Sequence, residues 1–133
     1  MSLMDWNEKL DIGVEEMNCE HKMLLQIMNK LYDDFLGSAS YDVLKENLDL
    51  LKEKTIEHFQ HEEAYMEKIN FEGLPGHKFI HKSLLEKFLV FYQEFVTLKK
   101  LSEDFFQFLK IWLSAHIQGI DCKYGRDKIR KIA

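Results

Sequence analysis

The clearest structural signal in the chain lies in residues 41–70, which read YDVLKENLDLLKEKTIEHFQHEEAYMEKIN. Apolar or candidate buried positions recur there after four and then three residues, a spacing that returns to one face of an α-helix. These positions are Leu44, Leu48, Leu51, Thr55, His58, Glu62, Tyr65 and Ile69. The same repeat lets helices pack side by side at about 20°. Residues 41–70 therefore predict one long helix of a bundle.

The same repeat predicts three further helices. One proline and six glycines in 133 residues leave few positions at which helices can end. The breaks fall at residues 37–40, 73–76 and 99–102, so the predicted helices span residues 18–36, 41–70, 75–98 and 103–130. Asn18, Ser40 and Ser102 are the expected N-caps, and Pro75 suits a first helical position. The other seams run through His21, Leu25, Met28, Tyr32 and Phe35; His77, His81, Leu84, Phe88, Phe91, Phe95 and Leu98; Phe105, Leu109, Trp112 and His116.

The predicted architecture is all-α, an up-down-up-down antiparallel four-helix bundle. Short connections between long amphipathic helices make sequential helices antiparallel neighbours. Residues 1–17, with Trp6, Leu10, Ile12 and Val14, are expected to form an N-terminal arm across the bundle. At this length, residues 1–133 are expected to make a single domain.

Composition narrows the classes of function. Apolar residues make up 46% of the chain, too many for a disordered segment. A net charge of −5 argues against a nucleic-acid partner, and no apolar run is long enough to span a bilayer. Two cysteines, Cys19 and Cys122, are too few for a disulfide framework, so we expect a cytoplasmic protein with both thiols packed in its interior.

Five of the six histidines fall on the predicted buried seams, and an antiparallel bundle brings them to one end. The start of the first helix, the end of the second, the start of the third and the end of the fourth share that end. The candidate ligands there are His21, His58, Glu62, His77, His81, His116 and Asp121. The pairs His58/Glu62 and His77/His81 are four residues apart, so each pair points from one helix face toward the same place.

Seven such groups indicate metal ions. Five imidazoles and two carboxylates could not all find proton partners in a dry core, and leaving them unpaired would cost a few kcal/mol each. They are too many for one tetrahedral zinc and too rich in nitrogen for calcium or magnesium. Two ions of iron or another mid-row transition metal fit, with Glu62 and Asp121 as bridging carboxylates. A ferritin-like site is excluded, because no histidine has a glutamate three positions before it.

Two positions need a separate argument. Asp121 follows His116 by five residues, which places it about 140° round an ideal helix, and a one-turn π-bulge near Gly119 would return it to the site. His61 lies one residue before Glu62, about 100° off the seam, and is predicted not to be a ligand.

These motifs closely resemble the hemerythrin family, and within it the bacteriohemerythrins. The resemblance rests on His21, on His58-Phe59-Gln60-His61-Glu62-Glu63, on His77-Lys78-Phe79-Ile80-His81 and on His116-Ile117-Gln118-Gly119-Ile120-Asp121. It extends to Trp6, Met66, Trp112-Leu113 and Tyr124, nearly the whole chain. The family includes an up-down-up-down bundle, myohemerythrin, so the resemblance and the fold prediction overlap. His61 and Cys122 have no match in the family pattern.

The resemblance implies a non-haem diiron centre that binds dioxygen. His77, His81 and His116 would hold one iron and His21 with His58 the other, bridged by Glu62, Asp121 and an oxo or hydroxo group from solvent. Dioxygen would bind reversibly at the iron beside His21 and His58. The expected walls of its pocket are Leu24, Trp112, Leu113 and Ile117.

The expected function is therefore that of an oxygen carrier or store, not an enzyme. One alternative is a domain that reports oxygen or redox state to a protein partner, although the sequence shows no signalling module. Another is a diiron reductase of peroxide or nitric oxide. That reading is weaker because no residue supplies an evident general acid near the open iron.

Overall fold

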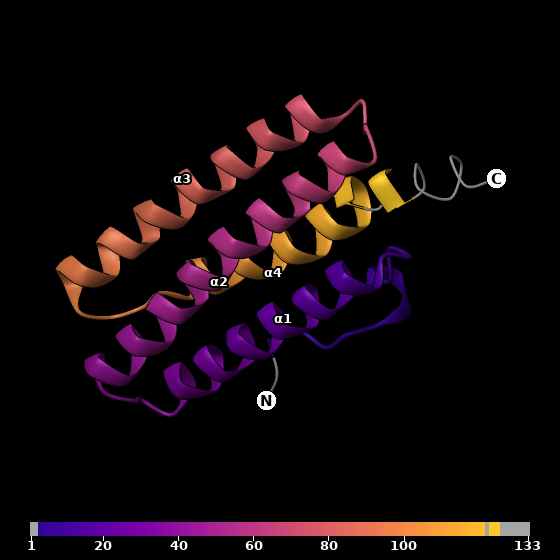
Figure 1. Cartoon of the computed structure of the whole chain (residues 1–133). Coiled ribbons are helices and arrows are strands. Elements are labelled where there is room, and N and C mark those ends of the chain that lie inside the picture. The colour runs from indigo at the N-terminus through magenta and orange to yellow at the C-terminus, as the bar shows by residue number, and fades with distance from the viewer. Residues whose placement is uncertain (1–2, 122, 126–133) are drawn as a thin grey trace.

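The computed structural model describes residues 3–121 and 123–125, and in these residues the chain forms long helices and no strand. Four long helices, α1 (Glu15–Leu36), α2 (Tyr41–Lys68), α3 (Leu74–Leu98) and α4 (Glu103–His116), run alternately up and down (Figure 1). A short 3-10 helix, η1 (Glu8–Leu10), precedes them, and a π-helical turn, η2 (Ile117–Asp121), follows α4. The predicted all-α four-helix bundle is confirmed.

Serine caps set where two of the helices begin. The hydroxyl of Ser40 accepts a hydrogen bond from the backbone N–H of Val43, and that of Ser102 accepts one from Phe105. These bonds satisfy donors that the first helical turn leaves free. Both predicted caps are confirmed, and Pro75 lies in the first turn of α3, where its missing N–H is not needed.

The start of α1 differs from the prediction. The helix begins at Glu15, three residues before the expected position, so Asn18 is not its N-cap. The Asn18 side chain is buried instead, where its oxygen accepts from the Ile12 backbone N–H and its amide donates to Asp11. Gly13, at a φ of 80°, makes the turn directly after these two partners. Asn18 therefore anchors the arm rather than starting the helix.

The N-terminal arm closes one end of the bundle. Leu10, Ile12 and Val14 are buried in the core, and the Lys22 ammonium lies 4.8 Å from the centre of the Trp6 ring. Further back, the Asn29 side chain bonds the backbone N–H and carbonyl of Met4. Figure 1 shows the arm running from the side of α1 to the end at which α1 starts and α4 finishes.

Two predicted interior positions lie on the surface. Cys19 is a free, exposed thiol, because it shares the outer face of α1 with Glu15, to which its sulfur lies at 3.7 Å. Leu98 is 61% exposed, because α3 ends there. Cys122 and the expected end of the fourth helix near residue 130 lie outside the described residues. No helix within the described ranges combines the length and the apolar composition that crossing a membrane requires.

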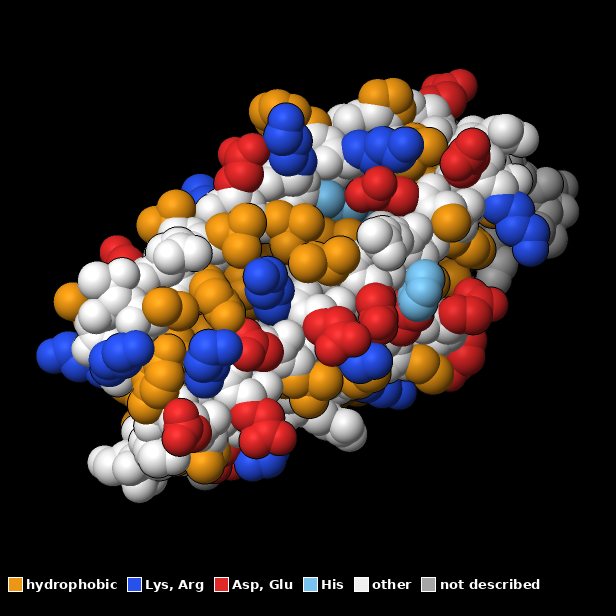
Figure 2. All heavy atoms as spheres, turned by 60° about the vertical axis from the view of Figure 1, so that its left-hand side comes forward, with side chains coloured by type: hydrophobic (Ala, Val, Ile, Leu, Met, Phe, Trp, Pro, Cys, Tyr) orange, Lys and Arg blue, Asp and Glu red, His pale blue; other side chains and the backbone are white. Residues whose placement is uncertain are grey.

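The face in Figure 2 mixes acidic and basic side chains with scattered hydrophobic ones. In the part of the chain that the structure describes, nine polar or charged side chains are buried inside the bundle.

Candidate metal centre

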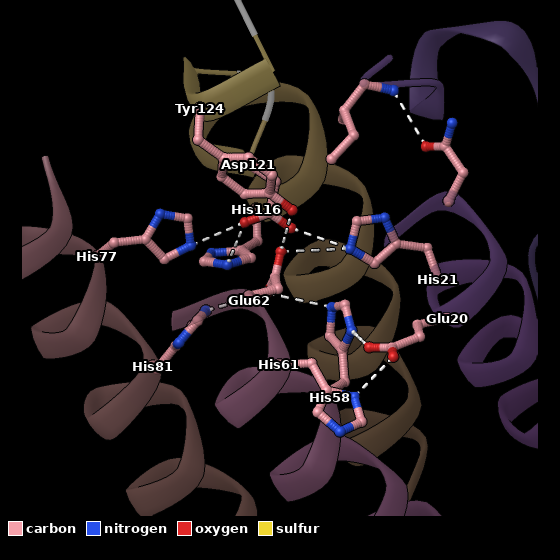
Figure 3. Close-up of polar contacts among 12 residues, drawn as sticks. Glu20, His21, His58, His61, Glu62, His77, His81, His116, Asp121 and Tyr124 are labelled. Carbon is pink, nitrogen blue, oxygen red and sulfur yellow. Dashed lines mark hydrogen bonds and ion pairs between the residues drawn. The ribbon is translucent and has the colours of Figure 1, made fainter. Parts of the chain in front are cut away.

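The end of the bundle closed by the arm holds a buried cluster of seven polar side chains. They come from α1, α2, α3, α4 and η2, and none is more than 6% exposed. The seven are His21, His58, Glu62, His77, His81, His116 and Asp121. They are the seven candidate ligands named from the sequence, and the bundle brings all of them together, with Glu62 at the centre (Figure 3).

The donor atoms divide into two groups that share both carboxylates. One group is Glu62, His77, His81, His116 and Asp121, and the other is His21, His58, Glu62 and Asp121. Within each group the ligand atoms all lie within 4.8 Å of one another. Shared carboxylates are what two adjacent metal positions need, and the groups are unequal, with five donors against four.

The π-helical turn brings Asp121 into this cluster. Residues 117–121 form η2 directly after His116, which confirms the predicted widening of the helix. Asp121 Oδ1 then lies 2.9 Å from Nε2 of both His77 and His116, and its Oδ2 lies 3.2 Å from His21 Nε2. An undistorted helix would have pointed this carboxylate about 140° away from His116.

The close contacts in the cluster are not ordinary hydrogen bonds. Four histidines have a buried Nε2 atom without a hydrogen-bond partner: His21, His77, His81 and His116. Both carboxylate oxygens of Asp121 and the Oε1 atom of Glu62 are likewise buried and without a partner. Several of these atoms nonetheless lie at ion-pair distance, such as His81 Nε2 and Glu62 Oε1 at 3.2 Å. Atoms that approach closely without aiming protons at one another have their lone pairs free, so the residues present fit a metal.

The charged side chains of the cluster stabilise one another. Burial opposes ionisation of Glu62, but the His58 charge and contacts with His21, His58 and His81 hold its pKa well below the usual range. Burial likewise opposes a charge on His58, yet Glu62 and Glu20 raise its pKa to about 10. The carboxylates are therefore anions, the form in which they bind metals.

Three residues outside the predicted set hold members of the cluster. Glu20 Oε1 lies 2.6 Å from His58 Nδ1, and Glu63 Oε2 lies 2.8 Å from His81 Nδ1. The Tyr124 hydroxyl donates to Glu62 Oε2 at 2.6 Å, and burial raises the pKa of this tyrosine further, so it stays a donor. The sequence signal for Glu20 and Glu63 was their position directly beside His21 and Glu62.

Apolar side chains surround the cluster. Leu24, Trp112, Leu113 and Ile117, the expected pocket walls, are all buried. Phe59 was not predicted; its ring stacks on that of His81 at 3.8 Å and meets Trp112 edge-on at 5.8 Å. A narrow apolar space, too small for a water molecule, adjoins Phe59 and Trp112.

His61 lies outside the cluster, as predicted. Its side chain is 57% exposed, and its Nδ1 lies 2.7 Å from Glu20 Oε2. It therefore contacts the cluster only through Glu20.

Comparisons with known proteins match nearly the whole chain. Residues 12–126 fit the family model of the hemerythrin HHE cation binding domain. A hemerythrin-like protein of Naegleria gruberi is 37% identical over 123 residues, covering 92% of each chain. The myohemerythrin of Riftia pachyptila is 32% identical, covering 90% of this chain and 88% of the relative. A bacteriohemerythrin of Stenotrophomonas maltophilia is 26% identical, covering 94% and 81%.

The fold has the same match among solved structures. A crystal structure of wild-type hemerythrin superposes with a TM-score of 0.87 at 26% sequence identity, covering 94% of this chain and 97% of the other.

Proposed function

This chain belongs to the hemerythrin family, and from that membership we propose that its buried cluster holds two iron ions and binds dioxygen reversibly. The proposed role is an oxygen carrier or store in the cytoplasm, not an enzyme. The observation that carries the proposal is the pair of overlapping donor groups, which share Glu62 and Asp121 but differ in number. The exposed free thiol of Cys19 agrees with a reducing compartment.

The residues have separate tasks in this proposal. His77, His81 and His116 would hold one iron, His21 and His58 the other, and Glu62 and Asp121 would join both. When bound, the ferrous pair supplies the electrons and the vacant coordination position that reversible dioxygen binding requires. The four-donor group leaves room for that position beside His21 and His58, since it offers one donor fewer.

The protein's other contribution is to exclude water. Leu24, Trp112, Leu113 and Ile117 are proposed to wall the dioxygen pocket, and all four are buried. A dry, apolar wall limits the access of water, which would otherwise help convert the centre to an inert ferric form. Among the described residues, every polar group of the cluster is either a candidate metal ligand or a residue that holds a candidate ligand in place. This arrangement favours oxygen binding over catalytic turnover.

An oxygen titration of the iron-loaded chain tests this function. The chain is loaded with ferrous iron without air, titrated with oxygen while its absorption spectrum is recorded, and then degassed. We expect about two irons and one oxygen per chain, with the spectrum reversing on degassing. Irreversible conversion to a ferric form with no reversible band would refute the carrier role.

A pair of variants checks that the iron lies in the cluster. His81→Ala removes a buried donor and should lower the iron content, whereas Gln60→Ala changes an exposed side chain on the same helix as Glu62 and should leave it unchanged. Equal iron content in both variants would place the metal elsewhere.

A further inference from the structure

A chain of three side chains links the cluster to the protein surface. Glu20, on α1, bonds two histidines of α2 at once: its Oε1 accepts from His58 Nδ1 at 2.6 Å and its Oε2 accepts from His61 Nδ1 at 2.7 Å (Figure 3). A carboxylate has only acceptor atoms, so each ring nitrogen is the donor. The Nδ1 atoms are thereby occupied, and His58 Nε2 faces Glu62 Oε1 at 3.1 Å.

In the five-donor group, a carboxylate outside the cluster bonds one histidine. His81 Nδ1 bonds Glu63 Oε2 at 2.8 Å, so one histidine of each group is held by a carboxylate outside the cluster. Within the described residues, which include all six histidines, Glu63 contacts no second histidine. The addition of His61 is therefore a feature of the four-donor group alone.

We propose that Glu20 and His61 are positioning residues that tune only the metal position made by His21 and His58. The inference deepens the proposed function and rests on it. An imidazole that donates Nδ1–H to a carboxylate is fixed in one tautomer and becomes a stronger ligand through Nε2. The four-donor position lacks a fifth protein ligand, so its affinity for metal depends more on His58 than the other position depends on any one histidine.

His61 acts on Glu20 rather than on the metal. The side chain of Glu20 is 22% exposed, so water can compete for the oxygen that His61 binds. The bond from His61 occupies that oxygen, holds the carboxylate against α2 and shares its negative charge. Loss of His61 should leave the His58 contact in place but less fixed, a smaller change than loss of Glu20.

The hydrogen bonds can be tested before any metal is added. Nuclear magnetic resonance of the metal-free chain labelled with ¹⁵N in its histidines should show hydrogen-bonded Nδ1 protons for His58, His61 and His81. Glu20→Gln should shift the His58 and His61 signals and leave that of His81 in place. Glu63→Gln should do the opposite. Unchanged His58 and His61 signals in Glu20→Gln would overturn the proposal.

Iron binding tests the consequence. Ferrous iron is titrated without air against a competing chelator, and ⁵⁷Fe Mössbauer spectra report the two positions separately. We expect Glu20→Gln to weaken one binding step by about tenfold or more and to alter one of the two ferrous signals. Glu63→Gln should weaken the other step and alter the other signal. If both variants changed the same signal, or both signals equally, the assignment to one position would be wrong.

Two variants separate His61 from a general surface effect. His61→Ala should weaken the same step as Glu20→Gln by a smaller factor, and His61→Asn, which keeps an N–H donor near the same place, should restore it in part. Gln60→Ala is the control, an exposed neighbour on α2. If His61→Ala matched Gln60→Ala in its His58 nuclear magnetic resonance signal and in its Mössbauer spectrum, His61 would have no positioning role.

Failure of the proposed function would look different. A wild-type chain that takes up no iron contradicts the diiron proposal itself. A wild-type chain that binds about two irons, with Glu20 variants that leave the two positions alike, overturns only the present inference.

Discussion

The two ends of the bundle are built from opposite kinds of side chain. At the end where residues 37–40 connect α1 to α2, aromatic rings pack on one another. The ring centre of Phe106 lies 4.9 Å from those of both Tyr32 and Phe35, and the ring centre of Tyr41 lies 4.9 Å from that of Phe95. At the other end, buried nitrogens and oxygens have no hydrogen-bond partner. The aromatic end is complete within the chain, whereas the cluster end needs a metal. Stability at the two ends should therefore respond differently to iron.

The largest expected effect is at the aromatic end. Phe106 is fully buried, so Phe106→Ala should lower the free energy of unfolding by about 3–5 kcal/mol through lost contacts and a cavity. The loss should be the same with and without iron, because the ring lies far from the cluster along α4. Denaturant unfolding of both forms measures it. A loss that depended on iron would show that the two ends are not independent.

Removal of iron should act on the cluster end alone. At a free iron concentration of about ten times the dissociation constant, each bound iron adds about 1.4 kcal/mol to the free energy of unfolding, so two irons add about 2.8 kcal/mol. A chelator should remove that amount and leave a folded chain, because the aromatic end does not depend on metal. Hydrogen exchange should then increase near His21, His58 and Asp121 but not near Phe95. Global unfolding on chelation would contradict this division.

The fold was predictable because its signals are local and periodic. The four-three repeat around Leu44, Leu48 and Leu51 gave α2, and serine hydroxyls marked the starts of α2 and α4. Asn18 has the same capping chemistry as those serines, yet its partners are Asp11 and Ile12 in the arm. Whether a polar side chain caps a helix or anchors a distant segment depends on tertiary contacts that local spacing does not contain.

The site was predictable where residues share a seam. Antiparallel helices carry seam residues at matching depth to one place, which is why six of the cluster residues converge. Asp121 joins them through the π-helical turn η2. Three supporting residues lie off the seams: Glu20, Glu63 and Tyr124. Each forms a hydrogen bond with a candidate ligand from a different segment of the chain. Their roles depend on how neighbouring helices are rotated, and a single sequence does not give that rotation.

A smaller effect on stability is expected where the N-terminal arm packs against the residues that follow η2. A Cβ added to Gly125 would overlap the carbonyl oxygen of Ile12, so Gly125→Ala must push the two segments apart. We expect a loss of about 2 kcal/mol in unfolding free energy. Gly76→Ala is the matched control: nothing lies within 4 Å of its added Cβ, and alanine favours the helix. Denaturant unfolding compares them, and equal effects would show that the arm yields freely.

The smallest expected effect on stability comes from removing one tyrosine hydroxyl toward each end of the bundle. Tyr124→Phe removes the donor to Glu62, and Tyr92→Phe removes the donor to the more exposed Asp49. In the metal-free chain the first should cost about 1.5 kcal/mol, because it leaves a buried carboxylate oxygen without its donor, and the second about 0.5 kcal/mol.

Iron should change only the first of these two values. A metal ion bound by Glu62 satisfies the carboxylate that Tyr124→Phe deprives of a hydrogen bond, so the loss should shrink in the iron-loaded chain. Asp49 lies outside the cluster, and its loss should stay the same. Parallel unfolding curves with and without iron give all four values. If iron left the Tyr124→Phe loss unchanged, Glu62 would not be among the groups that the metal satisfies.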